Sequence, residues 1–117
     1  MPVSSIAFTM YPVTDIERAE GFYRDALGLP PGEFRSPVWV EYEVAGGTFG
    51  IGNFEQVGKP GTAQALALEI ADLDGFRERL RGRGIEATEP HQLPNCRISM
   101  VQDPDGNTIW LHESKRT

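Results

Sequence analysis

Alternating apolar and polar residues predict β-strands in both halves of the chain. In residues 4–11, "SSIAFTMY", Phe8 and Met10 fall on one face and Tyr11 on the other, which is the two-residue period of a strand. The first half has two more such segments, "SPVWVEYEV" (36–44) and "TFGIGNF" (48–54). The second half has "AQALALEI" (63–70), the short "IEATEP" (85–90), "CRISMVQ" (96–102) and "NTIWLHE" (107–113). Proline and glycine favour a break at "PPGEF" (30–34) and a loop at "HQLPN" (91–95).

Two other segments carry apolar residues at the period of a helix. The first is "TDIERAEGFYRDALG" (14–28), which Thr14 or Asp15 can cap and Gly28 ends. Its apolar stripe consists of Ile16, Ala19, Phe22, Tyr23, Ala26 and Leu27. The second is "ADLDGFRERLRGRG" (71–84), with Asp72 as the cap. Each half of the chain is therefore expected to contain one helix.

The predicted order is a strand, a helix and three strands, and it occurs twice. Asp15 and Asp72 open the two helices 57 residues apart, and the turn glycines Gly47 and Gly106 are 59 apart, which indicates an internal repeat. We expect one α+β domain over residues 1–117, with module one at about 4–56, a linker at about 57–63 and module two at about 64–114. Two such units side by side would form a curved mixed sheet with helices outside and a pocket on the concave face.

Composition and charge narrow the class of protein. Hydrophobic residues make up 39% and charged residues 24% of the 117, as in a single globular domain. The net charge of −6 disfavours a nucleic-acid partner and favours a cationic ligand. The basic run at 77–83 has helical spacing, which is typical of a solvated helix face.

Cysteine use and hydropathy predict a cytoplasmic protein. Cys96 is the single cysteine, so no disulfide can form within the chain. No apolar run approaches the roughly 20 residues needed to cross a bilayer, and the N-terminus does not resemble a signal peptide. We expect Cys96 to be a passive thiol, because its nearest candidate base is His91 beyond Pro94.

Three segments resemble the vicinal oxygen chelate superfamily. They are "VTDIERAEGFYRDALGL" (13–29), "LEIADLDGFRERLRGRGIEATEP" (68–90) and "VQDPDGNTIWLHE" (101–113). The superfamily includes glyoxalase I, extradiol dioxygenases, fosfomycin-resistance enzymes and bleomycin-resistance proteins. The resemblance implies paired βαβββ modules with clefts between them, and a homodimer.

The resemblance also points to four positions where metal-dependent members carry ligands. A histidine seven residues before the helix-opening aspartate would fall at Phe8 and Ala65, and a glutamate four residues after the turn glycine at Ile51 and Trp110. These side chains offer no oxygen or nitrogen donor suited to a divalent ion, so we expect no metal, no cofactor and no catalytic residue. Candidates for displaced ligands are Glu41, Glu43, Glu69, His91, His112 and Glu113, which have no familiar metal-ligand spacing.

Without a metal, the pocket favours binding over chemistry. The leading hypothesis is a metal-independent binder of an aromatic or cationic small molecule, similar to the bleomycin-resistance proteins that sequester a drug. The predicted ligand contacts are Phe8, Met10, Ile51, Asn53, Ala65, Ala67, Trp110 and His112. One alternative is a superfamily enzyme, metal-free or with displaced metal ligands, acting as a lyase, isomerase or epimerase. The other is an interaction domain whose pocket its own side chains fill.

Three points about the pocket wall stay open at the level of sequence. Gly50 and Gly52 either make room for a ligand or allow the strand to curve. Trp39 and Tyr42 lie on opposite faces of one strand, so at most one of them faces the pocket. Arg97 would hold an anionic group only if its own face is the concave one.

Overall fold

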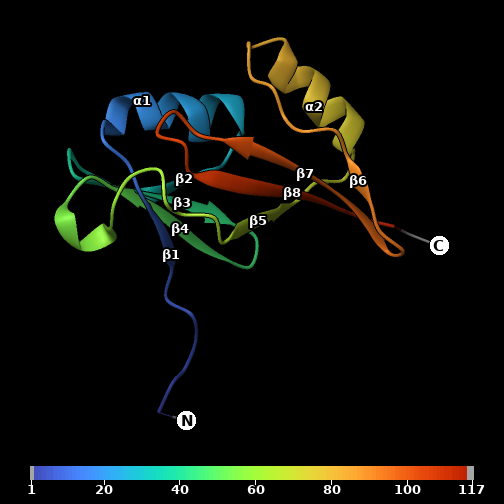
Figure 1. Ribbon diagram of the computed structural model, residues 1–117. Helices are drawn as coiled ribbons and strands as arrows, with labels where there is room; N and C mark the ends of the chain where they lie inside the picture. The colour runs from blue at the N-terminus through green and yellow to red at the C-terminus, as the bar shows by residue number, and fades with distance from the viewer. Residues whose placement is uncertain (1, 116–117) are drawn as a thin grey trace.

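Each half of the chain forms a four-stranded mixed sheet in the computed structural model, which describes residues 2–115 (Figure 1). The first sheet has the order β1-β4-β3-β2 and the second β5-β8-β7-β6. The parallel pairs are β1 with β4 and β5 with β8. The first four strands are β1 (Thr9–Pro12), β2 (Pro31–Arg35), β3 (Trp39–Val44) and β4 (Gly47–Gly52). The others are β5 (Leu66–Glu69), β6 (His91–Gln92), β7 (Cys96–Gln102) and β8 (Thr108–Ser114). The predicted α+β class and strand order are confirmed.

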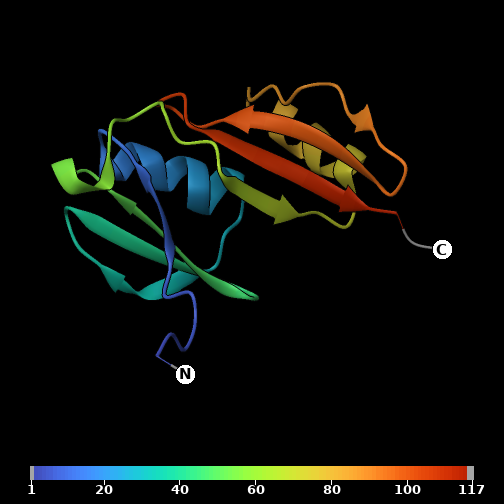
Figure 2. The ribbon, with the colours of Figure 1, turned by 60° about the horizontal axis from the view of Figure 1, so that its bottom comes forward.

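One helix covers one face of each sheet, and the two sheets lie side by side (Figure 2). Module one contains α1 (Ile16–Glu20), which continues into the π-helical segment η1 (Gly21–Ala26), and module two contains α2 (Leu73–Arg81). A short 3₁₀ turn, η2 (Glu55–Val57), follows β4. Asp15 and Asp72 cap the two helices by accepting backbone N–H groups three residues on. None of the helices within residues 2–115 is long and apolar enough to span a membrane.

The core lies between the helices and the sheet faces that they cover. On the first sheet its members are Tyr11, Val40, Tyr42, Phe49 and Ile51, and on the second they are Leu68, Val101, Ile109 and Leu111. From α1 and η1 come Ile16, Ala19, Phe22, Tyr23 and Ala26, and from α2 Leu73 and Leu80. Each large apolar side chain contributes about 1.5–3 kcal/mol by leaving water. The alternate residues of every strand must therefore point to the opposite, helix-free face.

Two strands differ from the sequence-based prediction in module one. β1 begins at Thr9, and residues 2–8 run away from it on the side opposite the helices (Figure 1). The predicted break at 30–34 is instead β2, which supplies the third strand of the module. Proline is tolerated there because β2 is an edge strand bonded only to β3, so its missing N–H leaves no ladder position empty.

The short strand of module two also lies elsewhere than predicted. Residues 85–90 are irregular, and β6 is His91–Gln92, within the predicted loop. The Thr88 hydroxyl accepts the Met100 N–H at 2.8 Å, where a regular ladder would use a backbone carbonyl. Arg77 donates to the carbonyls of Ala87 and Thr88. Around residues 85–90, side chains therefore make hydrogen bonds that a strand would make with its backbone, and the alternating pattern there does not produce a strand.

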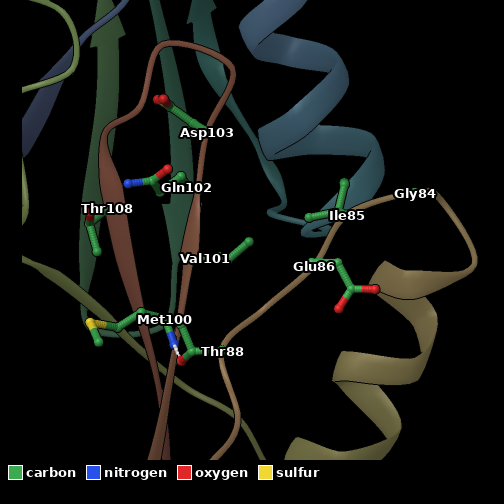
Figure 3. Close-up of a pocket in the computed structure, with 9 residues that line it drawn as sticks. All are labelled: Gly84, Ile85, Glu86, Thr88, Met100, Val101, Gln102, Asp103 and Thr108. Atoms are coloured by element: carbon green, nitrogen blue, oxygen red, sulfur yellow. Dashed lines mark hydrogen bonds between the residues drawn. The ribbon is translucent and has the colours of Figure 1, made fainter.

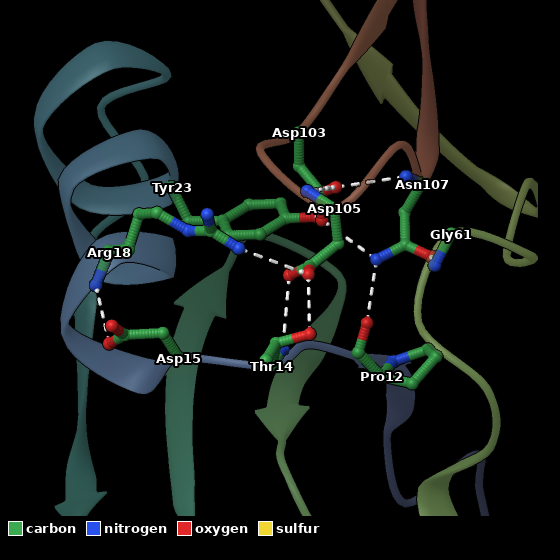
Figure 4. Close-up of polar contacts among 9 residues, drawn as sticks. All are labelled: Pro12, Thr14, Asp15, Arg18, Tyr23, Gly61, Asp103, Asp105 and Asn107. Carbon is green, nitrogen blue, oxygen red and sulfur yellow. Dashed lines mark hydrogen bonds and ion pairs between the residues drawn. The ribbon is translucent and has the colours of Figure 1, made fainter.

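The turn between β7 and β8, residues 103–107, joins the two modules (Figure 4). Asn107 is fully buried and donates to the Pro12 carbonyl at 2.7 Å and to the Asp103 carboxylate at 2.8 Å, while its side-chain oxygen accepts the Gly61 and Ala63 N–H groups. Asp105 accepts from the Thr14 backbone N–H and hydroxyl. Thr14 therefore braces this junction turn and does not cap α1.

Two tyrosines add hydrogen bonds across the same boundary. The Tyr11 hydroxyl donates to the Thr108 carbonyl at 2.6 Å and accepts the Leu66 N–H at 2.7 Å. The Tyr23 hydroxyl donates to Asp103 at 2.6 Å. Burial raises the pKa values of both hydroxyls, so both stay protonated and act as donors at neutral pH.

Candidate functional site

Most of the predicted ligand contacts lie on the helix-free faces of the two sheets. We call them the open face of module one, formed by Phe8, Met10, Trp39, Glu41, Gly50 and Gly52, and the open face of module two, formed by Ala67, Glu69, Met100, Trp110 and His112. Phe8 is 45% exposed and Met10 41%. Large apolar side chains are thus presented to solvent on the side that no helix covers.

On the open face of module one, the Trp39 indole lies across two glycines of β4. A Cβ on Gly50 would overlap the indole, and one on Gly52 would lie 2.9 Å from it. Phe8 packs edge-on against Trp39 with ring centroids 5.3 Å apart. The Trp39 N–H donates to the Glu41 carboxylate at 2.9 Å. The glycines therefore make room for an indole of the chain itself, and Trp39, not Tyr42, faces the open side.

The open face of module two has its tryptophan on the last strand. Trp110 lies opposite Ala67 on β5 and Met100 on β7, and its indole N–H donates to the Gln64 carbonyl at 2.9 Å. Two residues further along β8, the Nδ1 atom of His112 is 2.6 Å from the Glu69 carboxylate. Glu69 also accepts the Ser114 N–H at 2.8 Å. This N–H, followed by His112, lowers the pKa of Glu69 to about 2.

Most of the predicted contacts lie on these faces, but Ile51 does not. It is 0% exposed and points into the core. The positive-φ turn glycine that matches Gly106 (φ 92°) is Gly46 (φ 96°), not Gly47. The position four residues beyond is therefore Gly50, which lies opposite Met10 as Trp110 lies opposite Ala67. The placement of Ile51 on the pocket wall was wrong by one residue.

The same one-residue shift displaces Asn53. His112 pairs with Glu69 and Gly52 pairs with Pro12, so Gly52 is the counterpart of His112. Asn53 lies beyond β4, and its side chain donates to the Pro37 carbonyl at 3.2 Å. It borders a pocket beside the start of α1, away from the open faces. Phe8, Met10, Ala67, Trp110 and His112 lie on the open faces, and exposed Ala65 directly precedes β5.

The remaining polar candidates have other partners. Arg97 lies on the helix-covered side, where it bonds Glu113 at 2.9 Å and Asp74 at 3.2 Å, so its condition for holding an anion is not met. His91 is exposed on β6, and Cys96 is a free, half-buried thiol. Within residues 2–115, no three His, Cys, Asp or Glu side chains are grouped as metal ligands.

The sequence-based reasoning missed part of the wall. Trp39, Glu41 and Met100 lie on the open faces, and none of them was among the predicted contacts. The signal was present in the alternation of β3, because Tyr42 resembles a core residue and Trp39 has the opposite parity. What the alternation left undecided was which of the two faces the helix covers.

Two cavities lie near the open faces. One of about 240 Å³ lies at the seam between the modules and is bordered by Ile6, the β3–β4 turn and β5, including Ala67. Another, of about 510 Å³, lies between residues 84–88 and the end of β7, and none of the predicted ligand contacts lines it (Figure 3). Met100 borders this second pocket as well as the open face of module two.

Comparisons with known proteins agree with this geometry. The model of the Glyoxalase/Bleomycin resistance protein/Dioxygenase superfamily matches residues 5–111. The structure of TnmS3, an antibiotic binding protein from Streptomyces sp. CB03234, is 29% identical with a TM-score of 0.85, over 98% of this chain and 99% of that one. A glyoxalase/bleomycin resistance protein from the same organism is 30% identical with a TM-score of 0.80, over 92% and 98%.

More distant similarity extends to an enzyme. Lactoylglutathione lyase from Agrobacterium tumefaciens is 22% identical with a TM-score of 0.79, over 97% of this chain and 96% of that one, which shows a shared fold alone. A search of curated protein sequences gives no significant match. The family model covers most of the chain and the solved structures share its whole fold, so the chain belongs to the glyoxalase/bleomycin resistance protein/dioxygenase superfamily.

Proposed function

We propose that the protein binds a planar small molecule on its open faces without a metal ion. The observation that carries this proposal is the pair of tryptophans, Trp39 and Trp110, one on each open face and neither fully buried. An indole on a sheet surface offers a flat apolar platform, and each aromatic contact contributes about 0.5–1.5 kcal/mol beyond the area it buries. The likeness to an antibiotic binding protein supports the same reading.

The four positions that would hold a metal in a metal-dependent relative support binding without an ion. With the register corrected, they are Phe8, Gly50, Ala65 and Trp110. None of these side chains carries a donor atom suited to a hard or borderline divalent ion. The Glu69–His112 pair supplies two donors, fewer than the three protein ligands that a catalytic zinc site uses.

The charges near the two indoles favour a neutral or cationic ligand. Glu41 accepts the Trp39 N–H, and Glu69 stands beside His112, so each open face carries a carboxylate next to its aromatic platform. A cation over an indole face gains about 0.5–2 kcal/mol. An aromatic cation would therefore be attracted both by the ring and by the nearby carboxylate.

A second copy of the chain completes the pocket in this proposal. Val3, Ile6 and Phe8 are exposed apolar residues of the segment before β1. Phe8 belongs to the open face of module one. The segment that carries them extends on the side opposite the helices (Figure 1). Covering such surfaces is the usual role of a partner subunit. We therefore propose a cytoplasmic homodimer in which residues 1–117 act as one two-module domain.

Tryptophan fluorescence tests the binding proposal. Acridine orange, a planar cation, should quench the emission of the wild-type protein, and Trp39→Phe and Trp110→Phe should each remove part of the quenching. Anionic 8-anilinonaphthalene-1-sulfonate should bind more weakly. If neither dye changes the emission or the unfolding midpoint, the binding proposal is wrong. Stoichiometric Zn, Ni, Mn or Fe in the purified protein would favour the enzyme alternative instead.

A further inference from the structure

His112 is held in a fixed orientation on the open face of module two. Its Nδ1 atom lies 2.6 Å from one oxygen of Glu69, and the other oxygen accepts the Ser114 N–H at 2.8 Å. Glu69 and His112 are register partners on β5 and β8. The Ser114 N–H of β8 therefore orients the Glu69 carboxylate, and the carboxylate orients the imidazole in turn.

The partner of Nδ1 decides where the proton of the neutral ring lies. An ionised carboxylate can only accept hydrogen bonds, so the ring must donate, and Nδ1 carries the hydrogen. The low pKa of Glu69 keeps its carboxyl group ionised at neutral pH. Nε2 is then an acceptor, and no residue among 2–115 bonds it. A neutral His112 thus presents a lone pair at the sheet surface.

The position of His112 relative to Trp110 suggests what that lone pair meets. Both residues lie on the same face of β8, two positions and thus roughly 6.8 Å apart along the strand. Trp110 is partly exposed, and its two cross-strand neighbours, Ala67 and Met100, are a small and a flexible side chain. A ring system stacked on Trp110 would therefore have one edge beside the imidazole.

We infer that Nε2 of His112 accepts a hydrogen bond from a hydroxyl on the edge of a planar ligand stacked against Trp110. This inference rests on the proposed function and adds the ligand class, which is an aromatic hydroxyl compound. Glu69 is a positioning residue because it selects the tautomer without touching the ligand. The class follows from the direction of the bond, since an acceptor selects a donor.

A matched pair of probes tests the inference. 2-Naphthol and 2-methoxynaphthalene share one ring system, but only the first can donate a hydrogen bond. NMR titration at about pH 7.5, following the two indole N–H signals, gives both dissociation constants. The wild-type protein should prefer 2-naphthol by about 3- to 10-fold. His112→Phe should abolish this preference and still bind the ether, while the control His91→Phe, two strands away on β6, should keep it.

Nitrogen-15 chemical shifts of the wild-type imidazole supply a second measurement that needs no variant. They should show the neutral ring of His112 protonated at Nδ1, and protonation at Nε2 would overturn the inference. Equal affinity of the wild-type protein for the two probes would also overturn it and leave the binding proposal intact. If neither probe shifts either indole signal while acridine orange still quenches the tryptophan emission, the inference fails and the binding proposal stands. If acridine orange also has no effect, both fail.

Discussion

Two buried tyrosines in the same aromatic cluster should respond in opposite ways when their hydroxyls are removed. Tyr23 is 0% exposed and Tyr42 1%, and their rings lie 6.3 Å apart. The Tyr23 hydroxyl donates to Asp103 at 2.6 Å across the module boundary. Within residues 2–115, the Tyr42 hydroxyl has no hydrogen-bond partner. Replacement of either tyrosine by phenylalanine keeps the ring and changes only the polar atom.

The contacts of each hydroxyl set the expected sizes. A hydrogen bond to a charged group contributes about 1.5–3 kcal/mol. The Asp103 oxygen that Tyr23 bonds also accepts from the Asn107 amide at 2.8 Å, so Tyr23→Phe does not leave it bare. We expect a loss of about 2 kcal/mol. Burial raises the pKa of Tyr42 to about 12 and leaves its O–H desolvated without compensation, so Tyr42→Phe should stabilise by about 0–1 kcal/mol.

Urea unfolding followed by far-UV circular dichroism measures both free energies. The two variants should differ by about 2–3 kcal/mol, which corresponds to roughly 8–12 °C in melting temperature for a chain of this length. Unchanged m-values would show that the comparison concerns stability rather than a change of the unfolded state. A loss of stability in Tyr42→Phe equal to that in Tyr23→Phe would refute the reasoning. Such a result would show that the hydrogen bond of the hydroxyl does not determine the change in the free energy of unfolding.

Three further predictions concern the junction turn, the indole platform and acid stability. Asn107→Ala removes the four side-chain hydrogen bonds of a buried residue and should cost about 3 kcal/mol or more, whereas Asn53→Ala, at an exposed site, should cost about 0.5 kcal/mol; chemical denaturation compares them. Gly50→Ala should displace Trp39, lowering stability by about 1–3 kcal/mol and shifting tryptophan emission, while Gly47→Ala, with open space around its Cβ, should do neither. The hydrogen bond from Arg97, followed by the Leu73 N–H, lowers the pKa of Glu113. The stabilisation from Glu113 is therefore present above its ordinary value of about 4.3 and lost as the pH falls toward its folded-state value. Glu113→Gln should destabilise by about 1 kcal/mol at neutral pH, and the difference should vanish in acid unfolding series.

The parts of the fold that local chemistry determines were predictable from the sequence. Asp15 and Asp72 cap the helices as expected, because a short carboxylate before an apolar stripe satisfies free N–H groups whatever surrounds it. β7 follows its alternating pattern over its whole length, Cys96–Gln102. The two-fold repeat of a strand, a helix and further strands emerged from the same local signals, although β2 was not among the segments predicted as strands. No pairing between distant residues was needed for any of these.

The parts that depend on pairing were harder to predict. Residues 31–35 form a strand because they pair with the edge of β3. Pro31 disfavours a strand in the sequence alone, so the strand was not predicted. The errors at Ile51 and Asn53 came from choosing between Gly46 and Gly47, which only the backbone angle of Gly46 resolves. Because side chains alternate along a strand, an error of one residue moves every side chain to the opposite face. The strand was right, but its core and pocket residues were exchanged.

The corrected register also explains why the two halves carry their indoles on different strands. Gly50 and Trp110 are equivalent positions, so module one lacks a side chain where module two has a tryptophan. Trp39 reaches over from β3 and occupies the space above Gly50 and Gly52. Comparing equivalent positions would therefore find an aromatic platform in module two and none in module one. The two faces are similar because an indole ring covers the same part of each sheet, although it comes from a different strand. A side chain at position 50 would overlap the Trp39 ring, so only one of the two can be present. A tryptophan at position 50 would therefore have to be accompanied by a small residue at position 39. The paired variant Gly50→Trp with Trp39→Gly should retain the part of the dye quenching that comes from module one, and Gly50→Trp alone should lose that part.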